Sequence, residues 1–208
     1  MNQPDAISWL ALGDSYTIGE GVPPADTWPR QLARALREAD VPLADPRVLA
    51  ATGWTTDELG SAIDAEQDLG RHGFVTLLIG VNNQYRGRSA ADYRGEFTDL
   101  LRRAIGFAGG RAGRVLVLSI PDWGVTPFAL AQGRDRAQVA AELGAYNDAA
   151  RQVAERHHVA FVDITGTSRA HGAQADMLVA DGLHPSAAMH ALWCAQALPV
   201  AQRLLAAP

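Results

Sequence analysis

Residues 8–21 read SWLALGDSYTIGEG, an apolar run that stops at Gly13 and is followed at once by Asp14 and Ser15. An apolar segment of about six residues bounded by glycine, here 7–12, is typical of a strand buried on both faces of a parallel sheet. Ser15 then follows the carboxyl end of that strand, where open α/β sheets build their sites. Ser15 is therefore a candidate nucleophile, although a serine at such a position is more often a turn residue or a helix N-cap.

Apolar runs of strand length recur along the chain and alternate with segments that have the apolar spacing of helices. The expected strands are residues 7–12, 47–51, 74–79, 115–120 and 159–162. Expected helices cover 28–39, 93–107 and 139–157, and a last helix begins at Pro185 and is kinked or restarted at Pro199. This alternation predicts a single three-layer α/β/α domain over residues 1–208. By analogy, its five parallel strands take the flavodoxin-like order 2-1-3-4-5.

The composition excludes several classes of function. All 18 basic residues are arginine, and a chain without lysine cannot form a lysine Schiff base with pyridoxal phosphate or complete a Walker P-loop. The net charge of -5 argues against nucleic acid as a partner. The single Cys194, expected to be buried, leaves no intrachain disulfide and no Cys-x-x-Cys pair for zinc. We expect no cofactor and no metal.

The start of the chain carries no targeting signal that we recognise. Residues 1–5 contain no basic segment, and the first apolar run, of about six residues, is too short for a signal sequence or a membrane span. We therefore expect a cytoplasmic protein without stable membrane insertion. The sequence leaves its oligomeric state open.

Polar and reactive groups follow the ends of the expected strands. They include Ser15 after the first strand, Gly53 after the second, Asn82 after the third and Asp122 after the fourth, with Asp181-Gly182-Leu183-His184 before the last helix. Because parallel strands end at one edge of the sheet, residues far apart in sequence converge there on one cleft.

Serine catalysis needs a base within hydrogen-bond reach and a group that orients the base. Asp181 and His184 suit these two roles because Gly182 lets the chain turn between them. The remaining histidines lie in expected turns, at helix ends or, like His190, in the apolar last helix, and are expected to be structural or exposed. Asp14 is also expected to be structural, since a carboxylate facing the nucleophile would oppose a developing oxyanion.

The four blocks together resemble the SGNH hydrolases, also called GDSL esterases/lipases. The matching residues are Gly13-Asp14-Ser15, Gly53, Gly80-Val81-Asn82 and Asp181-Gly182-Leu183-His184. The resemblance implies a serine esterase with Ser15 as nucleophile, His184 as base and Asp181 as its partner. It also implies an oxyanion hole made of Ser15, Gly53 and Asn82. One departure is Asn83, where the family usually has aspartate, and this affects loop packing or substrate contacts rather than the triad.

These features predict a serine esterase that acts on small soluble esters through an acyl-enzyme. An apolar or aromatic substrate pocket is expected from residues near the edge of the cleft, although core packing explains some of them equally well: Tyr16, Ile18, Trp54, Tyr85, Trp123 and Phe128. Arg86 is expected to be an exposed loop residue, or else a contact to an anionic alcohol. Within enzymes, carbohydrate O-deacetylation or acyl transfer by the same groups is the alternative. The second alternative is not an enzyme: a flavodoxin-like module that binds phosphate or flavin and catalyses no reaction.

Overall fold

The computed structural model describes residues 6–206. Its sheet has five strands, all parallel, in the order β2-β1-β3-β4-β5, so the predicted order is confirmed. The strands are β1 (Trp9–Asp14), β2 (Arg47–Ala51), β3 (Phe74–Leu78), β4 (Val115–Leu118) and β5 (Ala160–Val162). Strands β1, β3 and β4 are buried along their whole length, which is why their sequences are continuous apolar runs rather than alternating ones.

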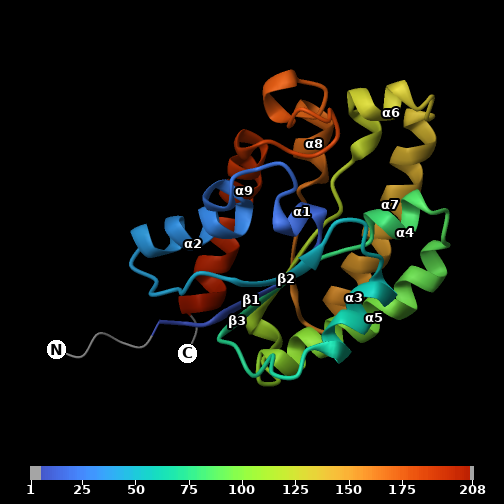
Figure 1. Cartoon of the computed structure of the whole chain (residues 1–208). Helices are drawn as coiled ribbons and strands as arrows, with labels where there is room; N and C mark the ends of the chain where they lie inside the picture. Colours follow the sequence, from blue (N-terminus) through green and yellow to red (C-terminus); the bar gives the residue numbers. More distant parts are fainter. Residues whose placement is uncertain (1–5, 207–208) are drawn as a thin grey trace.

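Helices cover both faces of this sheet. They are α1 (Ser15–Ile18), α2 (Trp28–Glu38), α3 (Thr56–Ala65), α4 (Val81–Tyr85), α5 (Ala90–Phe107), α6 (Pro127–Ala131), α7 (Arg136–Arg156), α8 (Thr165–His171) and α9 (Ala187–Ala206). Short 3-10 turns are η1 (Pro24–Asp26), η2 (Ala112–Arg114), η3 (Trp123–Val125) and η4 (Ala175–Met177). Helices α2 and α9 pack together on one side of the sheet, and α3 and α5 lie on the other, where α5 also packs on α7 (Figure 1). This is the three-layer arrangement that the sequence predicts.

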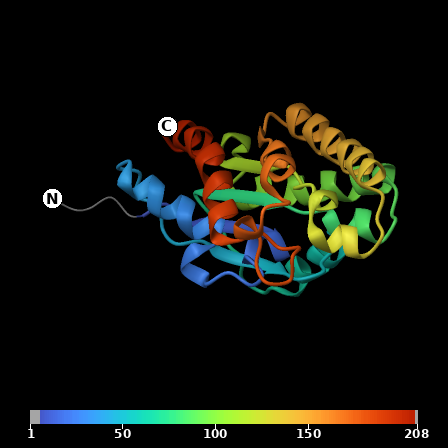
Figure 2. The same cartoon turned by 90° about the horizontal axis from the view of Figure 1, so that it is seen from above.

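The contact between α2 and α9 includes one buried polar pair. The backbone N–H of Trp28, at the start of α2, donates a hydrogen bond of 2.7 Å to Nδ1 of His190 on α9. Burial lowers the pKa of His190 to about 3, so its imidazole stays neutral and can accept that bond. Seen from above, α2 and α9 again lie side by side (Figure 2).

Several expected boundaries are wrong by a few residues, and two of them lie beside the site. Strand β1 extends to Asp14 because Gly13 and Asp14 still pair with β2, so Ser15 follows it directly. Helix α9 begins at Ala187, because Pro185 pairs with Leu178 in an isolated bridge. The same helix continues through Pro199 to Ala206 without a restart.

Helix α3 was not expected at all. Its buried face consists of only Thr56, Leu59 and Ile63, which is too short a stripe to mark a helix by apolar spacing. The available signal was the capping box formed by Thr55 and Glu58, in which each side chain bonds the other residue's backbone N–H.

Cys194 is buried, as expected. Within residues 6–206, every helix is too short or too polar to serve as a membrane span. The targeting prediction made for residues 1–5 lies outside the described residues.

Candidate active site

Ser15 is the first residue of α1, directly after β1. The carboxylate of Asp14 caps this helix by accepting the backbone N–H of Tyr16 at 3.0 Å. Gly13 allows the close approach of β3, because a Cβ at this position would lie 2.5 Å from the carbonyl oxygen of Leu78. The backbone that carries Ser15 is therefore held at the carboxyl edge of the sheet.

Asp14 is fully buried beside this nucleophile candidate. Burial raises its pKa to about 7, although backbone N–H groups of Tyr16 and Gly80 partly oppose the rise. Among the described residues, no group bonds its second oxygen, Oδ2. The structure thus places Asp14 as the cap of α1.

Asp181 and His184 form one tight turn before α9. Gly182 has a φ of 68°, in the left-handed region, and Oδ1 of Asp181 accepts the backbone N–H groups of Leu183 (2.8 Å) and His184 (2.9 Å). Its other oxygen, Oδ2, lies 2.6 Å from Nδ1 of His184. Partial burial raises the pKa of Asp181, but these hydrogen bonds outweigh it and leave the pKa below its ordinary value.

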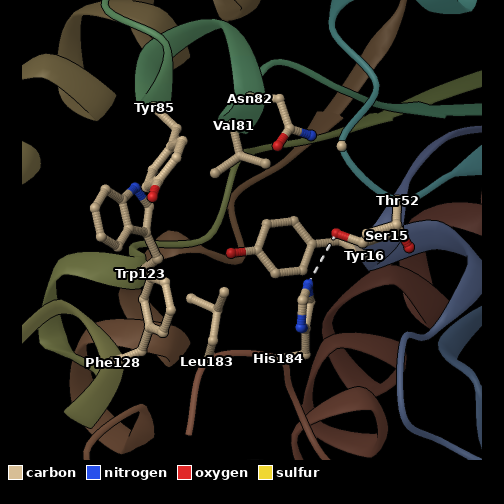
Figure 3. A pocket seen from close by; sticks show the side chains of 11 residues that line it. Ser15, Tyr16, Thr52, Val81, Asn82, Tyr85, Trp123, Phe128, Leu183 and His184 are labelled. Carbon is tan, nitrogen blue, oxygen red and sulfur yellow. Dashed lines mark hydrogen bonds between the residues drawn. The ribbon is translucent and has the colours of Figure 1, made fainter. Parts of the chain in front are cut away.

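Ser15, His184 and Asp181 form a continuous chain of contacts. Nε2 of His184 lies 3.1 Å from Oγ of Ser15, although the two residues are 169 positions apart (Figure 3). Because an ionised carboxylate can only accept, Nδ1 of His184 donates to Asp181, and Nε2 is then free to accept the Ser15 hydroxyl proton. The structure therefore brings together the three residues that the sequence predicted as a triad.

Gly53 and Asn82, the expected oxyanion donors, line the same cavity as Ser15 and His184. Gly53 adopts a left-handed φ of 83° in the turn that follows β2. Asn82 is the second residue of α4, and its Nδ2 donates one hydrogen bond of 2.9 Å to the carbonyl of Trp54. An amide nitrogen carries two protons, so the second remains available to a ligand.

The cavity beside Ser15 has a volume of about 220 Å³ and is largely apolar. Of the expected substrate contacts, Tyr16, Tyr85 and Trp123 line it. Phe128, which was also expected at the edge of the cleft, lines it as well. Sequence reasoning did not assign three further lining residues to the pocket: Thr52, Val81 and Leu183.

Aromatic side chains form one wall of this cavity. The rings of Tyr85 and Trp123 pack edge to face with their centroids 5.4 Å apart, and Phe128 lies 6.4 Å from Trp123 in the same way. The guanidinium of Arg134 covers Tyr85 at 5.1 Å from the ring centroid. In the described part of the chain, Trp54 and Ile18 are not among the lining residues; Trp54 instead packs against the hydrophobic core.

The sequence profile of the GDSL-like Lipase/Acylhydrolase family matches residues 11–192. The chain belongs to the GDSL-like lipase/acylhydrolase family. Within this family it is a hydrolase that acts on esters, so the alternative of a non-catalytic phosphate- or flavin-binding module is set aside. Comparison with curated proteins gives no match.

Several solved structures share the fold of this chain. TesA has a TM-score of 0.72 at 19% identity, covering 95% of this chain and 99% of its own. The psychrotrophic esterase EstA from Pseudoalteromonas sp., in a form inhibited by monoethylphosphonate, has a TM-score of 0.71 at 15% identity over 95% of this chain and 98% of its own. A member of the lipolytic G-D-S-L family from Veillonella parvula has a TM-score of 0.70 at 18% identity over 95% and 100%.

Asn83, the departure from the usual pattern of this GDSL family, is explained by its neighbours. It is fully buried, and its Oδ1 accepts the backbone N–H of Thr56, the first residue of α3, at 3.0 Å. Its Nδ2 donates to Oγ1 of Thr56 (2.6 Å) and to the carboxylate of Glu96 (3.3 Å). An aspartate here would place two carboxylates together, whereas the amide bonds both partners.

Arg86, the residue after α4, holds the turn that contains Gly53. Its Nη2 donates to the carbonyl of Gly53 at 2.6 Å, and its Nη1 pairs with Glu58 of α3 at 3.0 Å. Glu58 in turn accepts the backbone N–H of Thr55 at 2.9 Å. Arg86 is an exposed residue of the loop after α4, as expected, but its guanidinium binds the protein itself, and the alternative of an alcohol contact stays a prediction.

No group of three or more His, Cys, Asp or Glu side chains among residues 6–206 is arranged to hold a metal ion.

Proposed function

We propose that this GDSL hydrolase cleaves small carboxylic esters through an acyl-enzyme formed on Ser15. The observation that carries the proposal is the chain of contacts from Ser15 Oγ through His184 to Asp181, with distances of 3.1 and 2.6 Å. This order of nucleophile, base and orienting carboxylate is what acyl transfer by serine requires.

In the first step, Ser15 Oγ attacks the ester carbonyl and its proton passes to Nε2 of His184. Asp181, held by two backbone N–H groups, keeps the imidazole in the required tautomer and stabilises its cation. His184 then gives the proton to the leaving alcohol, and the acyl group remains on Ser15. A water molecule, activated by the same imidazole, releases the acid and restores the serine.

The negative charge that develops on the carbonyl oxygen is stabilised by hydrogen-bond donors of residues that line the same cavity. These are the backbone N–H groups of Ser15 and Gly53 and the Nδ2 group of Asn82. Donors of this kind contribute about 3 to 4 kcal/mol each in the transition state. The contacts of Arg86 to Gly53 and of Asn82 to Trp54 support this role because they fix the donors before substrate arrives.

The cavity supports a small, mainly apolar substrate. The cavity has a volume of about 220 Å³, and its lining is mainly apolar and aromatic. We therefore propose short acyl chains or a single ring as the acyl portion, packed against the aromatic wall of Tyr85, Trp123 and Phe128.

Replacement of Ser15 by alanine tests the nucleophile. The S15A variant should lose at least about a thousandfold in kcat on p-nitrophenyl butyrate, because no other group at that position can form the acyl-enzyme. Circular dichroism establishes that the variant is folded. Wild-type turnover by folded S15A would refute the assignment.

Covalent labelling tests the acyl-enzyme directly. EstA is described as inhibited by monoethylphosphonate, and a p-nitrophenyl ethylphosphonate should likewise attach an ethylphosphonyl group to Ser15 of this chain. Intact-mass analysis should show one added group on wild type and none on S15A, and peptide mapping should place it on Ser15. Labelling at another residue, with loss of activity, would show that the nucleophile lies elsewhere.

A further inference from the structure

The G-D-S-L pattern has leucine as its fourth letter, whereas this chain has Tyr16 directly after Ser15. The backbone of Tyr16 is held on both sides, because its N–H donates to Asp14 at 3.0 Å and its carbonyl accepts the indole N–H of Trp28 at 3.1 Å. Its ring packs edge to face on Trp193, with centroids 5.9 Å apart. The direction of the Tyr16 side chain is therefore set by the fold.

The hydroxyl of Tyr16 points away from Ser15 and across the pocket, toward Trp123 and Leu183 (Figure 3). No residue in the described part of the chain, 6–206, makes a hydrogen bond with it. Trp123 and Leu183 give this end of the cavity apolar surface, the buried carboxylate of Asp122 lies close enough to act on the phenol, and the tyrosine is only 3% exposed. The hydroxyl oxygen keeps some exposure to the cavity and bonds no described protein group, so a ligand oxygen placed there gains a hydrogen bond that the protein leaves unmade.

This hydroxyl is a donor under all ordinary conditions. Burial raises the pKa of Tyr16 well above its usual value, and the carboxylates of Asp14, Asp122 and Asp181 raise it further. The phenol therefore keeps its proton next to the catalytic groups.

We propose that the Tyr16 hydroxyl donates a hydrogen bond to an oxygen at the far end of the substrate's acyl group. The preferred substrates are then esters of short, mainly apolar acids that carry an ether, hydroxyl or carbonyl oxygen remote from the ester bond. This inference rests on the proposed function and names the class of acid released. It assigns to Tyr16 a selectivity that leucine at the same position cannot supply.

Two isosteric esters test the inference. In p-nitrophenyl 4-methoxybutanoate, an oxygen replaces the fifth-position methylene of p-nitrophenyl hexanoate, while the leaving group is the same. The ratio of kcat/KM for the ether to that for hexanoate should fall by about fivefold or more from wild type to Tyr16→Phe, since the variant loses only the donor. Tyr16→Leu should show the same low ratio.

A matched variant distinguishes the two tyrosines of the pocket. Tyr85 also lines the cavity but is 40% exposed, so Tyr85→Phe should keep the wild-type ratio. If the ratio of kcat/KM for the ether to that for hexanoate fell in Tyr85→Phe but not in Tyr16→Phe, the donor would be Tyr85 and the proposal would be overturned. An unchanged ratio in a folded, active Tyr16→Phe variant would also overturn the proposal for Tyr16, but it would leave the proposed esterase function intact. Full activity of S15A on both esters would instead overturn the proposed function.

Discussion

A single carboxylate, Asp181, organises the base of the site. One of its oxygens binds the backbone of the turn, through the N–H groups of Leu183 and His184, and the other binds the imidazole. The two tasks are separated on two atoms, so they can be separated by substitution.

The variant Asp181→Asn should keep the turn and lose the chemistry. Its amide oxygen can still accept both backbone N–H groups, but its NH₂ group would donate to Nδ1 of His184 and force the proton onto Nε2. Nε2 could then no longer accept from Ser15, so kcat should fall by about a thousandfold or more with little change in KM. Steady-state kinetics on p-nitrophenyl butyrate, with thermal melting to show retained folding, provide the check. A loss of less than tenfold would mean that the carboxylate does not set the tautomer.

At the scale of elements, α4 supports the residues proposed to form the oxyanion hole. Within and just after this short helix, Asn82 bonds the carbonyl of Trp54, Asn83 bonds the N–H of Thr56, and Arg86 bonds the carbonyl of Gly53. The turn after β2 and the start of α3 are thus bound to α4 at successive backbone groups.

Removal of one of these contacts should affect the rate more than binding. Arg86→Ala should lower kcat by about tenfold to a hundredfold with KM nearly unchanged, because the Gly53 N–H is then less well aimed at the transition state. Arg103→Ala is the matched control: Arg103 also bonds a glycine carbonyl, that of Gly60, and a carboxylate, Asp64, but farther along α3. It should leave kcat at the wild-type value. Arg86→Lys should restore part of the rate, and equal kcat losses in the two alanine variants would indicate a general effect on stability instead.

Elements could be predicted from the sequence where the signal is local, and could not where it depends on contacts between distant loops. Buried runs such as Trp9–Asp14 can be recognised locally, because a strand covered on both faces has no polar alternation to obscure it. The partner of Arg86 lies 33 residues away and depends on how two loops meet, so no local pattern reveals it. Trp54 was expected as a substrate contact from its position after a strand, yet the turn directs its ring to the core and presents its carbonyl to Asn82.

For the whole molecule, convergence of distant segments was predictable because the parallel sheet places every strand's carboxyl end at one edge. Ser15 and His184 meet there, as the order of the four blocks indicated. The packing of the helical layers was not predictable in the same way. His190 lies in an apolar helix and looks like an ordinary core residue, but it joins that helix to the first backbone N–H of α2.

This buried histidine should make stability depend on pH. Its pKa of about 3 in the folded protein lies below the ordinary 6.5, so the unfolded chain takes up the proton first as pH falls. Stability contributed by neutral His190 is therefore complete above pH 6.5 and is lost as pH falls toward 3, by about 1.4 kcal/mol per unit and on the order of 5 kcal/mol in all. Asp14, whose pKa rises to about 7, has the opposite sign, since its ionisation costs stability as pH rises from 3.8 toward that value.

His190→Asn separates the histidine from Asp14 and the other acids. The asparagine oxygen can take the place of Nδ1 in accepting the Trp28 N–H but does not titrate, and it loses the stacking of the imidazole on Trp193. The variant should be less stable than wild type at about pH 8, and this deficit should shrink by about 1 to 2 kcal/mol at about pH 5, because only wild type loses stability through this site. Urea unfolding of both proteins at the two pH values measures the change, and in the difference between them the contribution of Asp14 cancels. A deficit that stays constant with pH would show that His190 is not the group that couples the α2–α9 layer to acid.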